Sequence, residues 1–237
     1  MLENKTVLIT GSSRGIGAAT ARLAKKYGAK VILHGRTDSN DLKSLAKELD
    51  AEYIFCDASD EDAVKRAAGE LKADILINNA GISISKSFMD LSQEDWASTL
   101  NTNLLGTVNF SKTVIPQMLE QKYGRIVNVA SIKGFPATAG RAAFASSKAA
   151  LITLTASMAK ELKPYIMVNC VAPGFTETKQ TKKDWTERIY KQIEEVPLAR
   201  AAKPEEIAEV ILFAASDKAS YINGQTIIAD GGYSIRG

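Results

Sequence analysis

The sequence is poor in the residues that build metal centres and disulfide frameworks. It has one histidine, His34, and two cysteines, Cys56 and Cys170, among 237 residues. A single histidine excludes a histidine-based catalytic triad with partners and a multi-histidine metal site, so we expect no bound metal. The cysteines lie far apart, each in an apolar run. We therefore expect buried free thiols in a reducing compartment.

Net charge and long apolar runs are also scarce. The formal net charge of +3 is too small and too scattered to predict a nucleic-acid partner. Residues 1–5 carry no secretory leader, and no apolar run approaches the roughly 20 residues of a membrane span. We therefore expect a cytoplasmic protein without a nucleic-acid or membrane partner.

Apolar runs of strand length alternate with segments of helical period along the chain. Strands are expected at 6–10, 31–33, 53–55, 74–77, 125–130, 166–171 and 226–229. Helices are expected at 15–27, 41–49, 60–71, 92–119, 142–162, 182–195 and 204–215. Buried strands that alternate with helices predict a parallel sheet covered on both faces. The prediction is one α/β domain over residues 1–237, a Rossmann-type doubly wound fold with a seven-stranded parallel sheet.

A glycine-rich turn lies between the first strand and the first helix. Its glycines would let the backbone turn tightly and approach a pyrophosphate, which the start of the next helix attracts. The spacing G-x-x-x-G-x-G departs from the G-x-G-x-x-G fingerprint, but its place at the first strand–helix turn favours a cofactor site over a purely structural turn. The candidate residues are Gly11, Ser13, Arg14, Gly15, Ile16 and Gly17.

The end of the second strand lacks the acidic residue that binds the 2′-hydroxyl of NAD. The run there is His34-Gly35-Arg36-Thr37, so Arg36 stands close to that place, and Arg14 could approach from the other side. Two guanidiniums suit a 2′-phosphate, because arginine makes planar, charge-assisted bonds to phosphate oxygens. The sequence favours NADP(H) over NAD(H), although both arginines could be solvated surface residues.

A serine, an aromatic residue and a lysine form a second pattern. Ser131 follows the strand expected at 125–130, and Phe144 and Lys148 are four apart, on one face of the helix expected at 142–162. A hydroxyl, an aromatic ring and an ammonium group together are typical of a proton-handling site. Phe144, however, has a phenyl ring where such a site would need a phenol.

Together these motifs resemble the short-chain dehydrogenase/reductase family, nearly from end to end. The glycine turn, Ser131 and Lys148 fit its pattern. Further matching segments are Asn78-Asn79-Ala80-Gly81, Asn103 within 101–106, Pro173-Gly174, Pro204 to Ala208, and the tail from Tyr221 to Gly232. Within the family the chain is most similar to 3-oxoacyl-[acyl-carrier-protein] reductases.

The resemblance implies a proton-coupled hydride transfer from a nicotinamide to a carbonyl carbon, with a tyrosine as the acid. By position, Ser131 would bind the carbonyl oxygen, Lys148 would bind the nicotinamide ribose, and Asn103 would hold a water relay. Asp57 and Ala58 would flank the adenine. Other cofactor contacts would come from Asn79, Ala80, Gly81, Pro173, Gly174, Thr176 and Thr178.

Phe144 occupies the position of the family's tyrosine. Three explanations stay open: an engineered Tyr→Phe change that traps a complex, a natural homologue that keeps NADP(H) as a binding or regulatory module, and an active variant that protonates through water. In the last case Ser131, Lys148 and Asn103 would hold the water. Loss of a positioned general acid typically costs about 10²–10⁴ in rate, so we expect impaired turnover.

Substrate specificity should come from residues 175–196, which we expect to close over the substrate. One hypothesis is an acyl-carrier-linked ketone, with Lys122, Arg125 and Lys163 as a basic rim for the acidic carrier protein. The other is an alcohol, sugar or polyol dehydrogenase acting on a free small molecule. The resemblance also implies a homotetramer in which the helices around 92–119 and 142–162 pack between subunits.

Overall fold

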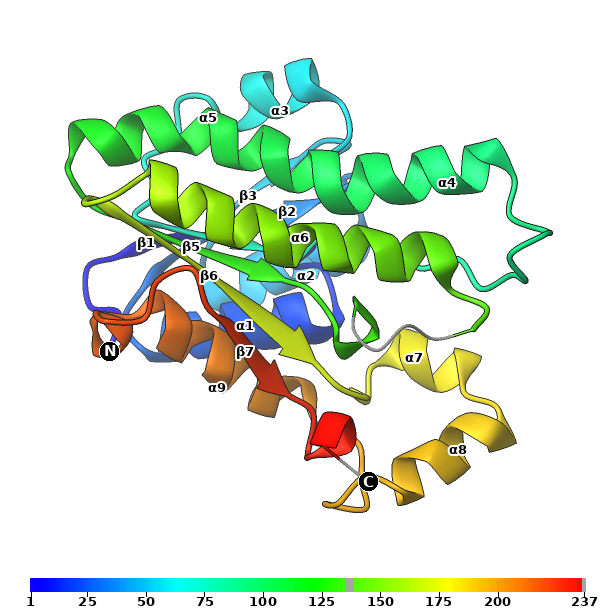
Figure 1. The fold of residues 1–237 in the computed structure, drawn as a ribbon. Coiled ribbons are helices and arrows are strands. Elements are labelled where there is room, and N and C mark those ends of the chain that lie inside the picture. The colour runs from blue at the N-terminus through cyan, green and yellow to red at the C-terminus, as the bar shows by residue number, and fades with distance from the viewer. Residues whose placement is uncertain (135–138, 236–237) are drawn as a thin grey trace.

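Seven parallel strands form one sheet in the order β3-β2-β1-β4-β5-β6-β7 (Figure 1). The computed structural model describes residues 1–134 and 139–235. The predicted seven-stranded parallel sheet is confirmed. In chain order the strands are β1 (Thr6–Ile9), β2 (Lys30–Gly35), β3 (Glu52–Phe55), β4 (Ile75–Asn78), β5 (Gly124–Val129), β6 (Ile166–Pro173) and β7 (Thr226–Ala229).

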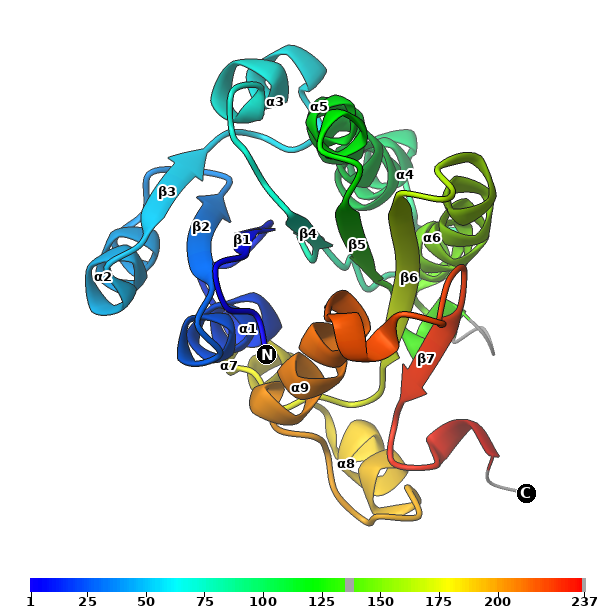
Figure 2. The same cartoon turned by 90° about the vertical axis from the view of Figure 1, so that its left-hand side faces the viewer.

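Helices cover both faces of the sheet (Figure 2). On one face lie α1 (Gly15–Lys26), α2 (Asn40–Leu49) and α9 (Pro204–Ala215), and on the other α3 (Glu61–Ala68), α4 (Gln93–Leu100), α5 (Gly106–Glu120) and α6 (Ala142–Glu161). Strand β1 contributes side chains to the hydrophobic cores on both faces of the sheet, because successive side chains point to opposite faces. Val7 and Ile9 pack in the core beneath α1, whereas Leu8 packs in the core beneath α5. Both cysteines are buried and free, as expected.

The helix predicted over 182–195 is wrong, because two short helices occupy this region. They are α7 (Lys179–Asp184) and α8 (Glu187–Glu194). Trp185 lies between them with an extended backbone (ψ 118°), and its ring meets that of Tyr190 edge to face at 5.6 Å. The corner places both helices beyond the carboxyl end of the sheet (Figure 1).

The helix predicted over 92–119 contains a π-helical turn at Asn101–Leu105, between α4 and α5. Its start is as expected: Ser92 Oγ accepts a hydrogen bond from Asp95 N, and the Asp95 carboxylate accepts one from Ser92 N. This reciprocal cap satisfies two of the helix's free N–H groups. At the other end, α5 continues through Pro116 to Glu120. Single π-helical turns are frequent at functional sites.

Helix α6 is long and apolar enough, by length and composition alone, to cross a membrane. Its sequence is not one continuous apolar run, because Lys148, Lys160 and Glu161 lie within it. In the structure α6 lies along β6 and beside α4 (Figure 1), and its Lys148 is buried at the carboxyl edge of the sheet. The core helix of a soluble protein passes the same test of length and composition.

Candidate cofactor and active site

The strand order reverses between β1 and β4, where the chain leaves β1 toward β2 and leaves β4 toward β5. In doubly wound sheets, ligands bind beyond the carboxyl ends of the strands at such a point. The glycine turn follows β1, Asn79–Gly81 follow β4, and Ser131 follows β5. The structure thus brings the predicted cofactor and catalytic segments to one edge of the sheet.

The glycine turn packs tightly against the segment after β4. A Cβ atom on Gly11 would lie 2.8 Å from Ala80 Cα, and one on Gly17 would lie 2.4 Å from the carbonyl oxygen of Gly11. Thr10 Oγ1 accepts hydrogen bonds from the backbone N–H groups of Asn79 (2.9 Å) and Ala80 (3.0 Å). Asn79 Nδ2 donates to the carbonyl oxygens of Thr10 and Gly11, both at 3.0 Å. The backbone on this side is therefore fixed before any ligand binds.

The start of α1 is open to this edge. Arg14 is the N-cap residue, it makes no side-chain cap, and the first turn has no acidic residue. The free N–H groups of such a helix start attract phosphate. Thr178 lies beside this turn, because a Cβ atom on Gly15 would meet its Cγ2 at 3.3 Å. Ser13 lies at the end of β2, where a Cβ on Gly35 would meet its Oγ at 2.9 Å.

His34 joins the ends of three neighbouring strands. Its Nδ1 lies 3.3 Å from Gly11 N, and its Nε2 lies 3.0 Å from the carbonyl oxygen of Cys56. Burial lowers the pKa of His34 to about 4, so the ring is neutral at pH 7. We assign the tautomer in which Nε2–H donates to Cys56 and Nδ1 accepts from Gly11. This role could not be predicted, because a lone histidine at a strand end has no characteristic spacing.

Arg36 and Asp57, from the ends of β2 and β3, approach each other at 3.7 Å (Nε to Oδ2). Partial burial opposes ionisation of Asp57, but hydrogen bonds from Ser59 and the nearby Arg36 lower its pKa below the ordinary value. Ala58 is buried, and its carbonyl oxygen accepts a hydrogen bond from Asn109 Nδ2 at 3.0 Å. The Arg36 side chain remains largely exposed, so its guanidinium can reach a ligand at this edge.

Asn103 is fully buried in the π-helical turn, and its amide joins two segments. Nδ2 donates to the carbonyl oxygen of Ile82 (3.0 Å) and to Ser147 Oγ (2.9 Å), while Oδ1 accepts from Ile82 N (2.8 Å). Ser147 Oγ in turn donates to the carbonyl oxygen of Phe144 at 2.7 Å. Residues three apart on a helix are neighbours, so Ser147 links the Asn103 amide to the start of α6.

Lys148 is the buried cation of the site. Its Nζ donates to the carbonyl oxygen of Val129 at 2.7 Å and lies 5.7 Å from the centre of the Phe144 ring. A Cβ atom on Gly81 would lie 3.5 Å from this Nζ. Burial lowers the pKa of Lys148 to about 8. An ammonium has three donors, and Val129 takes one of them, so two remain for a ligand beside Gly81.

A short 3₁₀ turn (η2, Ile132–Gly134) presents Ser131 to the start of α6. Ser131 is half-buried and its Oγ accepts a hydrogen bond from Lys133 N at 3.2 Å. The turn is close to α6, because a Cβ atom on Gly134 would lie 3.0 Å from Ala149 N. Phe144 is half-buried in the first turns of α6. Its ring has no atom that can carry a proton to a ligand.

Pro173, Gly174 and Thr176 continue this edge beyond β6. Gly174 is in close contact with the segment after β7, since a Cβ there would lie 2.7 Å from Asp230 Cα. Thr176 is buried, and its Oγ1 donates to the carbonyl oxygen of Gly174 at 3.1 Å. From here the chain enters α7, which Thr178 caps through Thr181 N.

The proposed basic rim is wrong for the chain's own site. Arg125 lies at the amino end of β5 and Ser131 follows its carboxyl end, so a strand rise of about 3.3 Å per residue puts them roughly 20 Å apart. Arg125 Nη2 bonds Asp217 Oδ1 at 3.0 Å, and Lys122 lies over the ring of Tyr165. Lys163 precedes β6 on the same side. All three residues therefore lie at the edge opposite the site.

Comparisons with known proteins match the chain over its length. A family model described as enoyl-(acyl carrier protein) reductase matches residues 11–234. The chain is 41% identical, over 99% of both chains, to 3-oxoacyl-[acyl-carrier-protein] reductase FabG of Thermotoga maritima. It is 40% identical, over 98% of both chains, to the FabG reductase of Aquifex aeolicus.

Solved structures give the same fold. A 3-oxoacyl-[acyl-carrier protein] reductase from Brucella melitensis superposes with a TM-score of 0.94 at 33% identity, covering 99% of this chain and 93% of the other. A second reductase from that organism, with bound NAD, gives 0.90 at 32% identity, covering 99% and 92%. A putative gluconate dehydrogenase from Agrobacterium tumefaciens gives 0.94 at 31% identity, covering 98% and 97%.

Proposed function

Because the chain belongs to the short-chain dehydrogenase/reductase family, we propose that it is the scaffold of an NADPH-dependent reductase for 3-oxoacyl-thioester-like ketones, with its general acid missing. Members of this family are nicotinamide-dependent oxidoreductases that act on CH–OH and C=O groups. The observation that carries the proposal is the buried Lys148, with two free donors beside Gly81 and Asn103. A buried ammonium without an ionic partner is costly unless a ligand uses it.

The residues present fit a dinucleotide. A Cβ atom on Gly11 would lie 2.8 Å from Ala80 Cα, so the turn has no room for a side chain there. The open start of α1 can hold a pyrophosphate. For NADP(H), Arg36 would bind the 2′-phosphate, with Arg14 beside it. Asp57 and Ala58 would flank the adenine, whereas Asn79–Gly81, Pro173, Gly174, Thr176 and Thr178 would line the nicotinamide half. The preference over NAD(H) rests on the two arginines.

When bound, the nicotinamide supplies the hydride. Ser131 Oγ would donate a hydrogen bond to the carbonyl oxygen, where negative charge develops in the transition state. Lys148 would hold the ribose hydroxyls with its two free donors. Asn103 has one oxygen lone pair left beside Gly81 for a water molecule. Phe144 cannot protonate the carbonyl oxygen. We therefore expect the protonation of that oxygen to limit the rate.

Restoring a phenol at position 144 tests this proposal. We expect Phe144→Tyr to raise single-turnover oxidation of bound NADPH by a 3-oxoacyl thioester by about 10²–10⁴, the usual contribution of a general acid, with little change in NADPH affinity. Phe88→Tyr, on an exposed loop, is the matched control and should change neither. If the unaltered chain oxidises bound NADPH as fast as Phe144→Tyr does, proton delivery through water is favoured. If NADPH binds tightly but Phe144→Tyr does not raise the rate of its oxidation, a regulatory binding module is favoured.

Reduction of a free small molecule is the second candidate function. The close superposition on a putative gluconate dehydrogenase favours it, because the two folds agree as well as those of the reductases do. Turnover of a carrier-bound ketone and of the same free ketone by Phe144→Tyr separates the two. A preference for the carrier-bound form supports the 3-oxoacyl reductase.

We further propose that residues 1–237 form one cofactor-binding domain, that it works in the cytoplasm, and that it assembles as a homotetramer. The apolar composition of α6 supports the assembly, because the helix has more apolar surface than its packing on the sheet covers. Light scattering that gave the mass of one 25.5 kDa chain would contradict the tetramer.

A further inference from the structure

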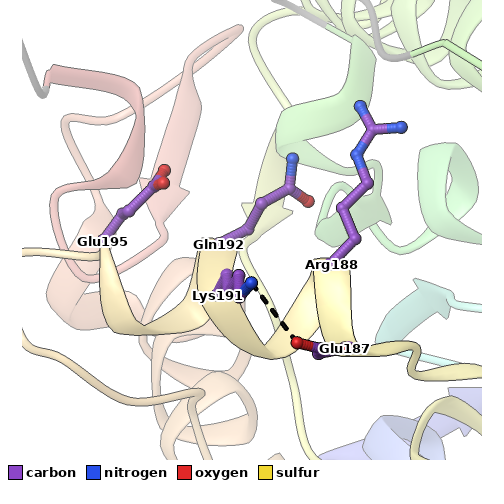
Figure 3. Close-up of a pocket in the computed structure, with 5 residues that line it drawn as sticks. All are labelled: Glu187, Arg188, Lys191, Gln192 and Glu195. Atoms are coloured by element: carbon purple, nitrogen blue, oxygen red, sulfur yellow. Dashed lines mark ion pairs between the residues drawn. The ribbon is translucent and has the colours of Figure 1, made fainter.

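Two groups of polar side chains differ in how firmly the fold holds them. The first lines a pocket of about 500 Å³ on α8 (Figure 3) and consists of Glu187, Arg188, Lys191, Gln192 and Glu195. Glu187 and Lys191 pair there at 3.3 Å, although both side chains are largely exposed. Water screens such exposed pairs, so they constrain their side chains only weakly. The second group lies in the core beside position 144.

The core group consists of Asn103 and Ser147, which water does not reach. Both residues are 0% exposed. Ser147 Oγ donates to the carbonyl oxygen of Phe144 at 2.7 Å and accepts from Asn103 Nδ2 at 2.9 Å. A hydroxyl has one hydrogen, so Ser147 uses its only donor on Phe144 and offers an acceptor to Asn103. A buried polar group that lost either contact would be costly to leave without a partner.

These contacts determine which way the Asn103 amide points. Because Ser147 Oγ can only accept from it, the end of the amide that faces α6 must be Nδ2. Ile82 gives the same assignment: its N–H needs Oδ1, at 2.8 Å, and its carbonyl oxygen needs Nδ2, at 3.0 Å. Both hydrogens of Nδ2 are then used, and Oδ1 keeps one lone pair. Ile82 thus fixes the orientation of the amide, and Ser147 fixes its place relative to α6.

The Asn103 oxygen and the buried lysine border the same space. A Cβ atom on Gly81 would lie 3.2 Å from Asn103 Oδ1 and 3.5 Å from Lys148 Nζ. An acceptor and a donor on two sides of this space suit one water molecule, which would accept from Lys148 and donate to Asn103. Ser147 precedes Lys148 on α6, so its bond to Asn103 sets how far the amide lies from the helix that carries the lysine.

We propose that Ser147 is a positioning residue for the reduction: it holds the Asn103 amide against α6, so that Oδ1 stays within one water molecule of Lys148 Nζ. The proposal rests on the proposed function, which requires an acid at position 144 for a fast reaction. Through its bond to the carbonyl oxygen of Phe144, Ser147 also joins the backbone of that position to Asn103. The hydroxyl has no second hydrogen for a ligand, so Ser147 acts through Asn103 and not on the substrate.

A purely structural role is the alternative, because other bonds also tie the loop after β4 to the start of α6. Arg141 Nη1 donates to Ser83 Oγ at 2.6 Å, and Lys86 N donates to the carbonyl oxygen of Gly140 at 3.1 Å. If Ser147 were one more tie of this kind, its loss would lower the free energy of unfolding and leave the relay amide in place. The two roles therefore differ in how a change at Ser147 combines with removal of that amide.

The test is a double-mutant cycle in the NADPH-loaded Phe144→Tyr chain, with single-turnover oxidation of NADPH by a 3-oxoacyl thioester as the readout. Ser147→Ala should lower the rate about tenfold, as expected for one lost buried hydrogen bond, and leave NADPH affinity unchanged. Asn103→Ala should lower the rate at least as much, and the double variant should be no slower than Asn103→Ala alone. Ser83→Ala removes the bond from Arg141 and is the matched control, whose effect should add to that of Asn103→Ala.

Additive losses for Ser147→Ala and Asn103→Ala, or an unchanged rate in Ser147→Ala, would overturn the proposal. If Phe144→Tyr oxidises no NADPH, the proposed function fails, and NMR of the Asn103 side-chain amide in the cofactor-free chain still tests the position of that amide. Ser147→Ala should speed exchange of the Nδ2 hydrogens with solvent at least about tenfold, the equivalent of one hydrogen bond, and Ser83→Ala should not. Equal exchange in the unaltered chain and in Ser147→Ala would show that Ser147 does not hold the amide, which also overturns the proposal.

Discussion

The two sides of the site are built from different materials. On the cofactor side, the glycine turn, Thr10 and Asn79 are joined by backbone hydrogen bonds and close approaches. On the substrate side, long basic side chains extend from a short turn, a helix start and the two-helix segment of α7 and α8. The backbone contacts of the first side leave little room for change. The second side consists of charged side chains, which single substitutions can alter without disturbing the fold.

Adding a methyl group to the cofactor side should give the largest effect. In Gly17→Ala the new Cβ would lie 2.4 Å from the carbonyl oxygen of Gly11, and backbone cannot move away cheaply. We expect NADPH affinity to fall by at least about 100-fold and the free energy of unfolding by about 2–3 kcal/mol, measured by fluorescence titration and urea denaturation. In Gly140→Ala the nearest atom of the described residues to the new Cβ is the carbonyl oxygen of Lys86, at 3.9 Å. This variant should lose only about 1 kcal/mol from its positive φ, with NADPH affinity intact.

Replacing the buried lysine should separate stability from binding. Lys148→Met removes a buried ammonium, and burial lowers the pKa of Lys148 from 10.5 to about 8, a penalty of about 3 kcal/mol at pH 7. The unfolded chain holds this proton up to pH 10.5, so wild-type stability should rise between pH 8 and 10.5. The variant should lack that rise. At pH 7 it should be about as stable as wild type, because loss of the hydrogen bond to the Val129 carbonyl oxygen offsets the removed penalty. It should bind NADPH about 30-fold more weakly. Equal NADPH affinity would show that Lys148 faces no ligand.

Arg36→Leu tests the proposed preference for NADPH over NADH. Its exposed guanidinium is the proposed partner of the 2′-phosphate, and a charge-assisted pair is worth roughly tenfold or more in affinity. NADPH binding should weaken by about tenfold, and NADH binding should stay the same in the same titration. Parallel losses for both cofactors would mean that Arg36 supports the loop through Asp57 and does not read the phosphate.

Acid should destabilise the fold through His34, on the cofactor side. His34 has a pKa of about 4 in the fold against 6.5 when unfolded, so its contribution to stability is complete above pH 6.5 and is lost as pH falls toward 4. The loss should reach about 3 kcal/mol, because protonation sets an N–H against Gly11 N–H. His34 is the only histidine in the sequence, so NMR can follow its ring directly. His34→Asn should flatten the urea-derived stability profile between pH 4 and 6.5.

The sequence was most informative where one local property decides the structure. Apolar runs gave the seven strands, and the close approaches of Gly11 and Gly17 correspond to the glycine spacing. The bond from Gly11 to His34 and the one from Asn103 to Ser147 join residues far apart in the chain, so no spacing predicts them.

The errors have physical causes as well. The extended backbone at Trp185 breaks a segment whose helical period continues on both sides. The prediction of a basic rim did not take account of strand direction, which the parallel sheet expected from the sequence already implies. Residues before a parallel strand and residues after it lie at opposite edges of the sheet.

The π-helical turn at Asn101–Leu105 also acts as a phase shift. It holds one residue more than an α-helical turn, so the side chains of α4 are rotated by about 100° from where an uninterrupted helix would put them. Deleting a single residue from this turn would restore a continuous α-helix. Either the side chains of α4 or the Asn103 amide would then be rotated away from their present neighbours. The Asn103 amide and the outward side chains of α4 therefore cannot change independently. A one-residue deletion would alter both the interior of the site and the surface that a second subunit would contact in the proposed tetramer.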